Sequence, residues 1–309
     1  MLKRLVNKFF QLLSRAQKKE NALNNSNEQL VIAANTLHRL NLTSSLEILK
    51  DIKKAEFKVF SQWGDDGIIH FLVDYLCLDV PIFVEFGVEN YTESNTRFLL
   101  LNKNWEGHIF DGDPENMQQV VNSDLYWRHN LTATSEWISK ENINQLLKER
   151  SLSGEIGILS IDIDGNDYWV WKEISQVNPQ MVIVEYNSLF GCEKTWTVPY
   201  KANFKRTEEH YSNLYYGASL PALCQLANDK GYSFVGCNSN GNNAYFVRND
   251  RLKQVEVKQP IEGFVMAQFR ESRNSKGDLS FLNYEERRQH IFGMPVFNTT
   301  MNRIEVVDS

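Results

Sequence analysis

The chain has 309 residues, of which 42% are hydrophobic and 23% are charged, and its formal net charge is -6. This composition is typical of a globular protein and excludes a largely disordered chain. The negative charge argues against a protein built mainly to bind nucleic acid, so we expect no nucleic-acid partner. The length allows one large domain with appendages or two smaller domains.

The four cysteines are scattered along the chain, without the close pairs of a zinc site or the density of a disulfide-built scaffold. No run approaches the roughly 20 apolar residues that cross a bilayer. The basic start has its apolar residues interrupted by charge, which excludes a secretory signal. We therefore expect a cytoplasmic protein with reduced thiols.

The first segment, residues 1–54, is predicted to be helical with an Asn-rich interruption at "NALNNSNEQ". In "MLKRLVNKFFQLLSRAQKK", apolar residues at helical spacing are separated by lysines and arginines. Such a helix packs on its own domain, associates with a partner subunit, or lies on the inner face of an anionic membrane. Self-association and peripheral membrane contact both stay open for this segment.

Residues 55–250 alternate between strand-like and helix-like patterns, which predicts an α/β fold. The predicted strands are "IFVEFG", "GHIFDGD", "HNLTAT", "IGILSIDIDG", "MVIVEYN", "SFVGCNS" and "NAYFVRN", the last two joined by the turn "NGNN". We expect a mostly parallel, seven-stranded, Rossmann-like sheet with helices on both faces, ending in an antiparallel hairpin. Residues 251–309 have weaker periodicity and are expected to pack on this main domain as a C-terminal extension.

The turn after the first predicted strand is acidic. In "IFVEFGVENYTESNT", Gly87 is the one glycine, and it lies between Glu85 and Glu89. A dinucleotide site requires several glycines so that backbone can approach a pyrophosphate, and two carboxylates repel that anion. S-adenosylmethionine has a sulfonium and an ammonium group and no phosphate. We therefore predict that these three residues help to bind it; the alternative is a turn with solvated acids.

The second predicted strand also ends in acids. "GHIFDGDPEN" places Asp111 at the strand end and Asp113 just beyond it. An acid at this position can accept hydrogen bonds from both ribose hydroxyls of a bound nucleoside. Both residues are therefore predicted to contact the cofactor. The same acid would serve NAD, so a nicotinamide-dependent oxidoreductase is an alternative interpretation.

Further acids follow the fourth and fifth predicted strands. "SIDIDGNDYWVW" contains Asp162, Asp164 and Asp167, and Glu185 ends the neighbouring strand. Oxygen ligands that converge from adjacent strands suit Mg²⁺ or another divalent cation, so we predict a metal site at Asp162, Asp164 and Glu185. Asp162 is also predicted to border the cofactor. For Asp167 the alternative is a cap of the helix that follows.

Methylation of a hydroxyl group requires help with its proton. The candidate catalytic residues are Asp162, Asp164 and His210, although a lone histidine in "KRTEEHYSN" is also typical of a surface. The long loop that contains His210 is rich in aromatic residues, which either stack on sugar rings or form a core. These aromatics are Trp196, Tyr200, Phe204, Tyr211, Tyr215 and Tyr216.

In the order of these motifs, the chain resembles FkbM-type S-adenosylmethionine-dependent methyltransferases of the kind found with surface-polysaccharide genes. The resemblance covers about Phe60 to Asn249 and rests on "SQWGDDGII", "VEFGVENYTESNT", "IFDGDPEN", "SIDIDGNDYWVW", "VIVEYN" and the closing hairpin region. It implies a class I methyltransferase fold and methyl transfer to a hydroxyl oxygen of a sugar or glycan precursor. It also implies cofactor positions at Glu85, Gly87 and Asp111, with Gln62 bordering the same pocket.

The chain departs from the family pattern in two places. The first motif lacks a second glycine, and Asp111-Gly112 replaces the usual Glu-Pro pair. Ribose binding should survive the exchange of one acid for another. The missing glycine leaves a further alternative open, a degenerate methyltransferase fold that acts as a scaffold without catalysis.

Overall fold

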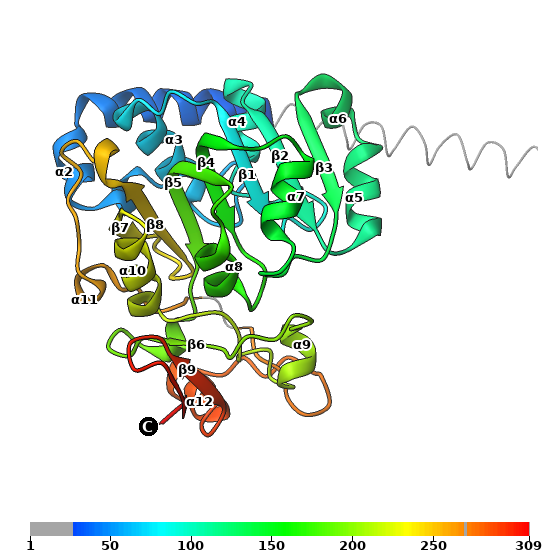
Figure 1. Ribbon diagram of the computed structural model, residues 1–309. Coiled ribbons are helices and arrows are strands. Elements are labelled where there is room, and N and C mark those ends of the chain that lie inside the picture. Colours follow the sequence, from blue (N-terminus) through cyan, green and yellow to red (C-terminus); the bar gives the residue numbers. More distant parts are fainter. Residues whose placement is uncertain (1–26, 269–270, 309) are drawn as a thin grey trace, which may run out of the picture.

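The computed structural model describes residues 27–268 and 271–308. Figure 1 shows a central sheet with helices on both faces and a smaller sheet below it. The basic amphipathic helix predicted at the start of the chain lies outside the described residues. Within residues 27–268 and 271–308, no helix is both long and apolar enough to cross a membrane.

The central sheet confirms the predicted fold class. It contains β1 (Ile82–Phe86), β2 (Glu106–Asp111), β3 (Leu131–Ser135), β4 (Gly154–Ile161), β5 (Val177–Glu185), β7 (Tyr232–Cys237) and β8 (Asn243–Arg248). In the described chain their order is β3-β2-β1-β4-β5-β8-β7, and β8 runs antiparallel to both β5 and β7. A mostly parallel, seven-stranded sheet with this inserted strand is the class I methyltransferase fold.

Helices cover both faces of the sheet because its strands are apolar on both sides. One face is covered by α3 (Asp65–Leu76), α4 (Arg97–Lys103), α5 (Pro114–Val121) and α6 (Asp124–Arg128). The other is covered by α7 (Ile143–Glu149), α8 (Asp167–Glu173) and α10 (Leu220–Asp229). Along β5, Met181 and Ile183 join the first core and Val182 and Val184 the second, as the two-residue period of a strand requires.

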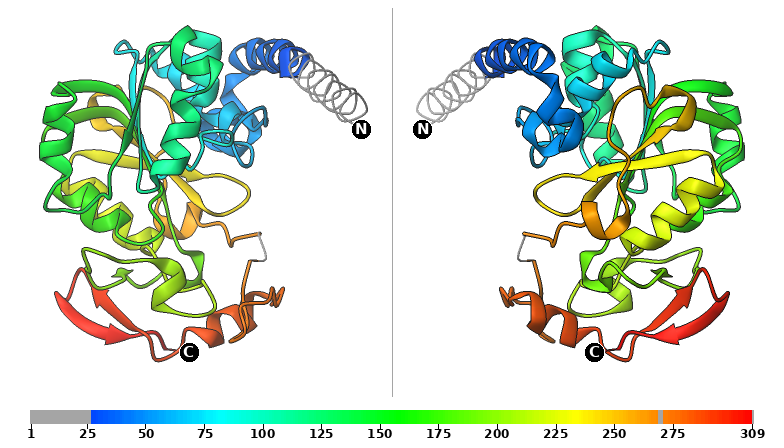
Figure 2. Two further views of the ribbon diagram at one scale, coloured as in Figure 1. Left: turned by 90° about the vertical axis from the view of Figure 1, so that its right-hand side faces the viewer. Right: turned by 90° about the vertical axis from the view of Figure 1, so that its left-hand side faces the viewer.

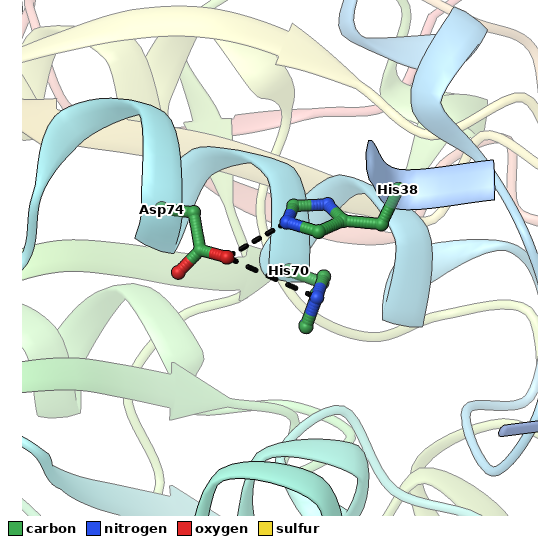
Figure 3. Close-up of side chains that lie close together, drawn as sticks. All are labelled: His38, His70 and Asp74. Carbon is green, nitrogen blue, oxygen red and sulfur yellow. Dashed lines mark hydrogen bonds and ion pairs between the residues drawn. The ribbon is translucent and has the colours of Figure 1, made fainter. Parts of the chain in front are cut away.

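The described part of the first segment packs on its own domain. Residues 27–43 are helical and lead into α2 (Ser45–Lys50) and the short helix η1 (Ile52–Ala55). Figure 3 shows His38 of this helix directed toward Asp74 of α3, with 2.7 Å between Nε2 and Oδ2. His70 lies beside them, and burial lowers its pKa to about 3. His38, His70 and Asp74 therefore connect the first helix to α3.

The C-terminal extension forms a small sheet with the loop that follows β5. The extension contributes α11 (Pro260–Gly263), α12 (Tyr284–His290), β9 (Pro295–Asn298) and β10 (Arg303–Val306), after η3 (Asn249–Arg251). The loop contributes η2 (Ser188–Phe190), β6 (Trp196–Thr197) and α9 (Arg206–Glu209), and the sheet order is β10-β9-β6. In Figure 1 this sheet lies below the carboxyl ends of the parallel strands.

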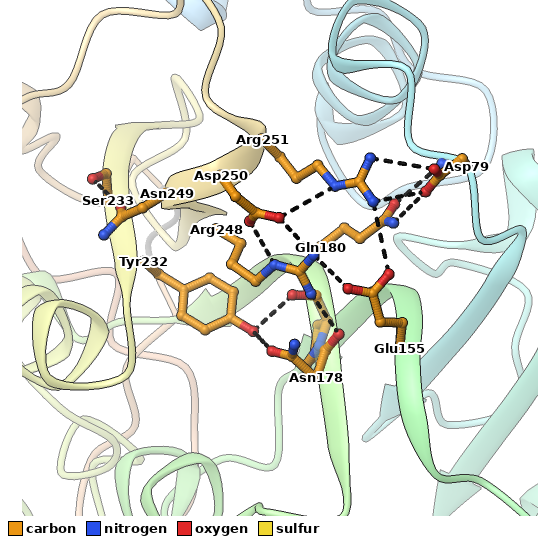
Figure 4. Close-up of polar contacts among 11 residues, drawn as sticks. Asp79, Glu155, Asn178, Gln180, Tyr232, Ser233, Arg248, Asn249, Asp250 and Arg251 are labelled. Carbon is orange, nitrogen blue, oxygen red and sulfur yellow. Dashed lines mark hydrogen bonds and ion pairs between the residues drawn. The ribbon is translucent and has the colours of Figure 1, made fainter.

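We call the side of the central sheet where the parallel strands end its carboxyl edge, and the opposite side its amino edge. Figure 4 shows a network of paired charges at the amino edge. Arg248 lies 2.6 Å from Glu155 and 2.7 Å from Asp250, and Arg251 lies 3.1 Å from Asp79. This network ties the start of β4 to the end of β8 and to the segment before β1.

Candidate functional site

A cavity of about 930 Å³ lies at the carboxyl edge, between the strand ends and the loop after β5. Among the described residues that line it, ten are acidic and two, Lys205 and Arg206, are basic. The acidic residues are Glu85, Glu89, Glu93, Asp111, Asp113, Glu136, Asp162, Asp164, Glu185 and Glu271. Even where burial keeps Glu85, Asp162 and Glu185 protonated, the other seven acids outnumber the two bases, and such walls concentrate cations and repel a phosphate-bearing ligand.

Gly87 lets three strand ends meet at the cavity floor. Its φ is +74°, and an added Cβ would lie 1.6 Å from the carbonyl oxygen of Asp162. Its own N–H donates to the carbonyl of Phe110 at the end of β2 over 2.9 Å. Only glycine fits this close approach of β1, β2 and β4, which explains why residue 87 is a glycine. Its contact with a cofactor stays a prediction.

Glu85 lines the cavity, but its carboxylate is largely engaged by the protein itself. It accepts hydrogen bonds from Ser94 Oγ at 2.5 Å, from the N–H of Asn95 at 2.9 Å and from the N–H of Thr96 at 3.1 Å. Burial raises the pKa of this carboxyl group. Glu85 therefore fixes the turn that enters α4, a role that the sequence did not predict. Its contact with a cofactor stays a prediction.

Asp111 is positioned at the end of β2 with acceptor capacity left over. One of its oxygens accepts the N–H of Glu89 at 2.7 Å and the other the N–H of Asp113 at 2.9 Å. A carboxylate has about four lone-pair sites, so Asp111 can still accept from ligand hydroxyls. Asp113 itself begins α5 and accepts the N–H of Glu115 at 2.8 Å. Gln62 is exposed on the cavity wall, as the resemblance implies.

The structure brings the three predicted metal ligands together. Asp162, Asp164 and Glu185 each place a carboxylate oxygen within 4.8 Å of the others. Glu185 is buried, and among the described residues its Oε2 has no hydrogen-bond partner. Burial, together with the neighbouring carboxylates, raises the pKa of Asp162 and of Glu185 well above the usual range. An orphaned buried oxygen beside two further carboxylates fits a divalent cation.

Arg206 supplies a positive charge from the protein itself. Its guanidinium lies 2.8 Å from Asp164 and 3.4 Å from Glu271, and it covers the ring of Tyr216 at 4.0 Å. No local pattern indicates this pairing, because Asp164 is 42 residues away in the sequence. Arg206 therefore connects the end of β4 to the loop and to the C-terminal extension.

Among the described residues, Asp167 and His210 do not line the cavity. Asp167 is buried and accepts the N–H groups of Ile163 at 2.8 Å and Gly165 at 3.0 Å, so it shapes the turn before α8. Burial raises its pKa to about 6. His210 is not among the described residues that line the cavity, and its Nδ1 lies 2.7 Å from Ser212 Oγ. The role of His210 as a general base stays a prediction.

Most aromatic residues of the loop form a core. Trp196, Phe204, Tyr215 and Tyr216 are buried under the small sheet, so stacking on a sugar is not their main role. The sequence missed Trp137, which follows β3 and lines the cavity. Its indole N–H donates to the carbonyl of residue 202 at 2.8 Å, and its ring packs against the backbone at residue 112.

No family model and no curated protein sequence matches the chain, so the FkbM-type resemblance stays a prediction. Similar solved structures include the N-terminal domain of EvdMO1 with SAH bound, at 11% identity and a TM-score of 0.40, covering 65% of this chain and 94% of that one. An S-adenosylmethionine-dependent methyltransferase from Clostridium acetobutylicum has 11% identity and a TM-score of 0.40, with coverages of 67% and 98%. An O-methyltransferase family protein from Burkholderia thailandensis has 12% identity and a TM-score of 0.36, covering 71% of each chain. At these values the likenesses carry no argument about chemistry, and the fold is assigned from the strand order.

Proposed function

We propose that the protein is an S-adenosylmethionine-dependent O-methyltransferase that methylates a hydroxyl group of a sugar or glycan precursor. The observation that carries this proposal is the charge of the carboxyl-edge cavity, which ten acidic residues line against two basic ones. The acidic residues attract the sulfonium and ammonium groups of S-adenosylmethionine, whereas they repel the pyrophosphate of a nicotinamide dinucleotide. The fold supplies the setting, because open α/β sheets bind their ligands at the carboxyl ends of the strands.

The cavity offers a place for each part of the cofactor. Asp111 is placed to accept hydrogen bonds from the ribose hydroxyls, and the ring of Trp137 offers an apolar surface for the adenine base. Gly87 lines the cavity beside these residues and is assigned to the methionine part. In this arrangement the sulfonium lies near Asp162, next to the acid cluster.

The transfer step needs a group that takes up the acceptor proton. The acceptor oxygen attacks the methyl carbon, the carbon–sulfur bond breaks, and the sulfur keeps the electron pair and loses its positive charge. The hydroxyl proton passes to a carboxylate, for which Asp162 and Glu185 are placed. Their raised pKa makes them stronger bases than ordinary carboxylates. Alignment of the reacting atoms and exclusion of water supply much of the acceleration.

A divalent cation at the same cluster is the alternative to a carboxylate base, because a carboxylate that binds a cation is held deprotonated and becomes a weaker base. Asp162, Asp164 and Glu185 would hold it, and the bound ion would polarise the acceptor hydroxyl as a Lewis acid. Arg206 already pairs with Asp164, so the protein neutralises part of the cluster by itself. Turnover in the presence of a chelator tests the ion separately from the methyl transfer.

The cavity lining supports an acceptor rich in hydroxyl groups. Asn95, Asn213, Asn242 and Asn243 also line the cavity, and among the described residues the Oδ1 of Asn243 has no hydrogen-bond partner. These amides replace the aromatic platform that the sequence suggested, because most of the loop aromatics are buried in the small core.

The test is incubation with methyl-labelled S-adenosylmethionine and a panel of sugar nucleotides and glycan fragments, followed by mass analysis of the products. We expect one acceptor class to gain the mass of a methyl group at a hydroxyl position. Binding of the cofactor without transfer to any hydroxyl acceptor would overturn the acceptor assignment. A folded protein that binds no S-adenosylmethionine would favour the scaffold interpretation.

A further inference from the structure

The contact between the first described helix and α3 brings together three side chains of types that bind metal ions. His38 comes from the first helix, which Figure 2 shows at the outside of the molecule. His70 and Asp74 come from α3, where a spacing of four residues places them on one face. One ligand atom of each residue lies within 4.8 Å of those of the other two. Figure 3 shows that both imidazole rings are directed toward the same carboxylate oxygen, Asp74 Oδ2.

His70 is the member of this cluster whose hydrogen-bonding capacity the protein does not satisfy. The residue is 2% exposed, and among the described residues its Nδ1 has no hydrogen-bond partner. Its Nε2 lies 4.0 Å from Asp74 Oδ2, which is beyond hydrogen-bond distance. A buried polar nitrogen without a partner lowers the stability of a fold. A cation between the two imidazoles and the carboxylate would give Nε2 of His70 the partner that it lacks.

The distances and the ligand types fit a tetrahedral ion. Zn²⁺ binds imidazole nitrogen and carboxylate oxygen at about 2.0–2.2 Å, which separates neighbouring ligand atoms by roughly 3.3 Å. Asp74 Oδ2 lies 2.7 Å from Nε2 of His38 and 4.0 Å from Nε2 of His70, so the two distances lie on either side of this value. Mg²⁺ and Ca²⁺ prefer oxygen ligands, whereas imidazole suits zinc and related transition metals. The two histidines therefore favour Zn²⁺.

We propose that His38, His70 and Asp74 bind one Zn²⁺ ion, which fastens the first described helix to α3. The side chain of Asp74 is 30% exposed, so the ion can enter from solvent and a water molecule can complete its coordination. Lys103 pairs with Oδ1 of Asp74 and leaves Oδ2, the oxygen that faces both histidines, to the ion. None of the three ligands is among the described residues that line the carboxyl-edge cavity, so the proposal is independent of the methyl-transfer chemistry.

The test is equilibrium dialysis of the full chain against Zn²⁺, with excess Mg²⁺ to compete for the all-oxygen cluster of the cavity, followed by elemental analysis. We expect Asp74→Asn, which keeps the size of the side chain but removes its charge, to weaken the binding of one Zn²⁺ ion by about 100-fold or more. The matched control is Asp124→Asn. Asp124 also pairs with a basic residue on a helix, Arg128 at 2.7 Å, and belongs to neither group of potential metal ligands in the described chain. This control should bind Zn²⁺ as the wild type does.

A second variant leaves all three ligands in place. Lys103→Met removes the positive charge beside Asp74 and should tighten Zn²⁺ binding by about 10-fold, an effect that a merely hydrogen-bonded cluster would not produce. Thermal melts show whether the variants are folded, and Lys103→Met decides the matter if Asp74→Asn is not. Zn²⁺ should raise the melting temperature of the wild type relative to a chelator-treated sample. The proposal is overturned if the wild type binds no Zn²⁺, if Asp74→Asn and Asp124→Asn bind it equally, or if Lys103→Met does not tighten its binding.

Discussion

At the amino edge of the central sheet, Arg248 and Arg251 meet three acids in short ion pairs (Figure 4). At the carboxyl edge, acids outnumber bases five to one along the cavity wall. Both edges belong to the same strands, so the difference does not come from the fold itself. Each of these acids at the amino edge has an arginine partner, whereas the carboxyl edge lacks positive charge that a ligand can supply.

The same contrast exists in the protonation of single residues. At the amino edge, hydrogen bonding to Arg248 lowers the pKa of Asp250. At the carboxyl edge, burial raises the pKa of Asp162 and Glu185. Buried acids with a strongly raised pKa are characteristic of functional sites. An acid with a structural role alone is usually paired with a positive charge, which lowers its pKa. The following predictions test whether the two edges differ in this way.

The largest effect is expected from removal of one acid at the carboxyl edge. Asp162→Asn or Glu185→Gln should lower kcat/KM for methyl transfer by about 1,000-fold, because each removes the proton acceptor or, where a cation is used, one of its ligands. Asp250→Asn at the amino edge is the control and should leave kcat/KM within about twofold. Equal losses in the variants of both edges would show that stability, and not chemistry, explains the effect.

The glycines of the two edges give the next largest contrast. Gly87 and Gly154 have φ values of +74° and +72°, but a Cβ at Gly154 would meet no atom within 4 Å. Gly154→Ala should lower the free energy of unfolding by about 1 kcal/mol through backbone strain alone. Gly87→Ala adds a clash with Asp162 and should cost about 3 kcal/mol or more. Urea titration measures both, and similar losses would contradict the close approach of the strands.

Acids of the two edges should change the free energy of unfolding in opposite directions as the pH rises. The pKa of Asp167 is raised to about 6, so its neutral form stabilises the fold at low pH and this contribution is lost as the pH rises from about 4 to 6. Between pH 4 and 6, the decrease in the free energy of unfolding should be about 2 kcal/mol smaller in Asp167→Asn than in the wild type. Asp250, whose pKa is lowered, contributes above pH 4 and loses its effect only below it. Asp250→Asn should therefore leave the slope between pH 4 and 6 unchanged, as urea titrations at several pH values will show.

The smallest effect is expected from the arginines. Arg206 lowers the pKa of Asp162 and Glu185, so Arg206→Gln should move the acidic limb of the kcat/KM profile to higher pH. At neutral pH the loss should be about 10-fold or less. Arg248→Gln at the amino edge should leave the profile in place. An unshifted profile in Arg206→Gln would show that this arginine does not reach the acid cluster.

The sequence predicted the sheet well because its signals are local. Each strand is an apolar run bounded by turn residues, and the Asn/Gly turn between β7 and β8 marks the closing hairpin. Helix α3 was missed because it begins inside "SQWGDDG", which was taken as a motif bordering the pocket. In the structure Asp66 of that motif accepts the N–H groups of Val59, Phe60 and Ser61 and starts the helix.

The site was predictable where it depends on strand ends and not where it depends on distant pairing. Asp111, Asp162 and Glu185 follow from the rule that ligands bind at the carboxyl edge. Pairing of β6 with β9 joins residues about 100 positions apart, which no local pattern indicates. The partners of Arg206, Asp164 and Glu271, are likewise 42 and 65 positions away in the sequence. The internal hydrogen bonds of Glu85 were missed because the turn "YTESNT" folds back onto its own strand.

The most direct test of the account is calorimetric titration of the folded chain with S-adenosylmethionine and, in parallel, with NAD. The account predicts that S-adenosylmethionine saturates one site and that Asp111→Asn weakens its affinity by about 10-fold or more, since a hydrogen bond to a charged group is lost. NAD should release no binding heat. Saturable binding of NAD, with none of S-adenosylmethionine, would contradict the claim that the acidic cavity receives a positively charged methyl donor.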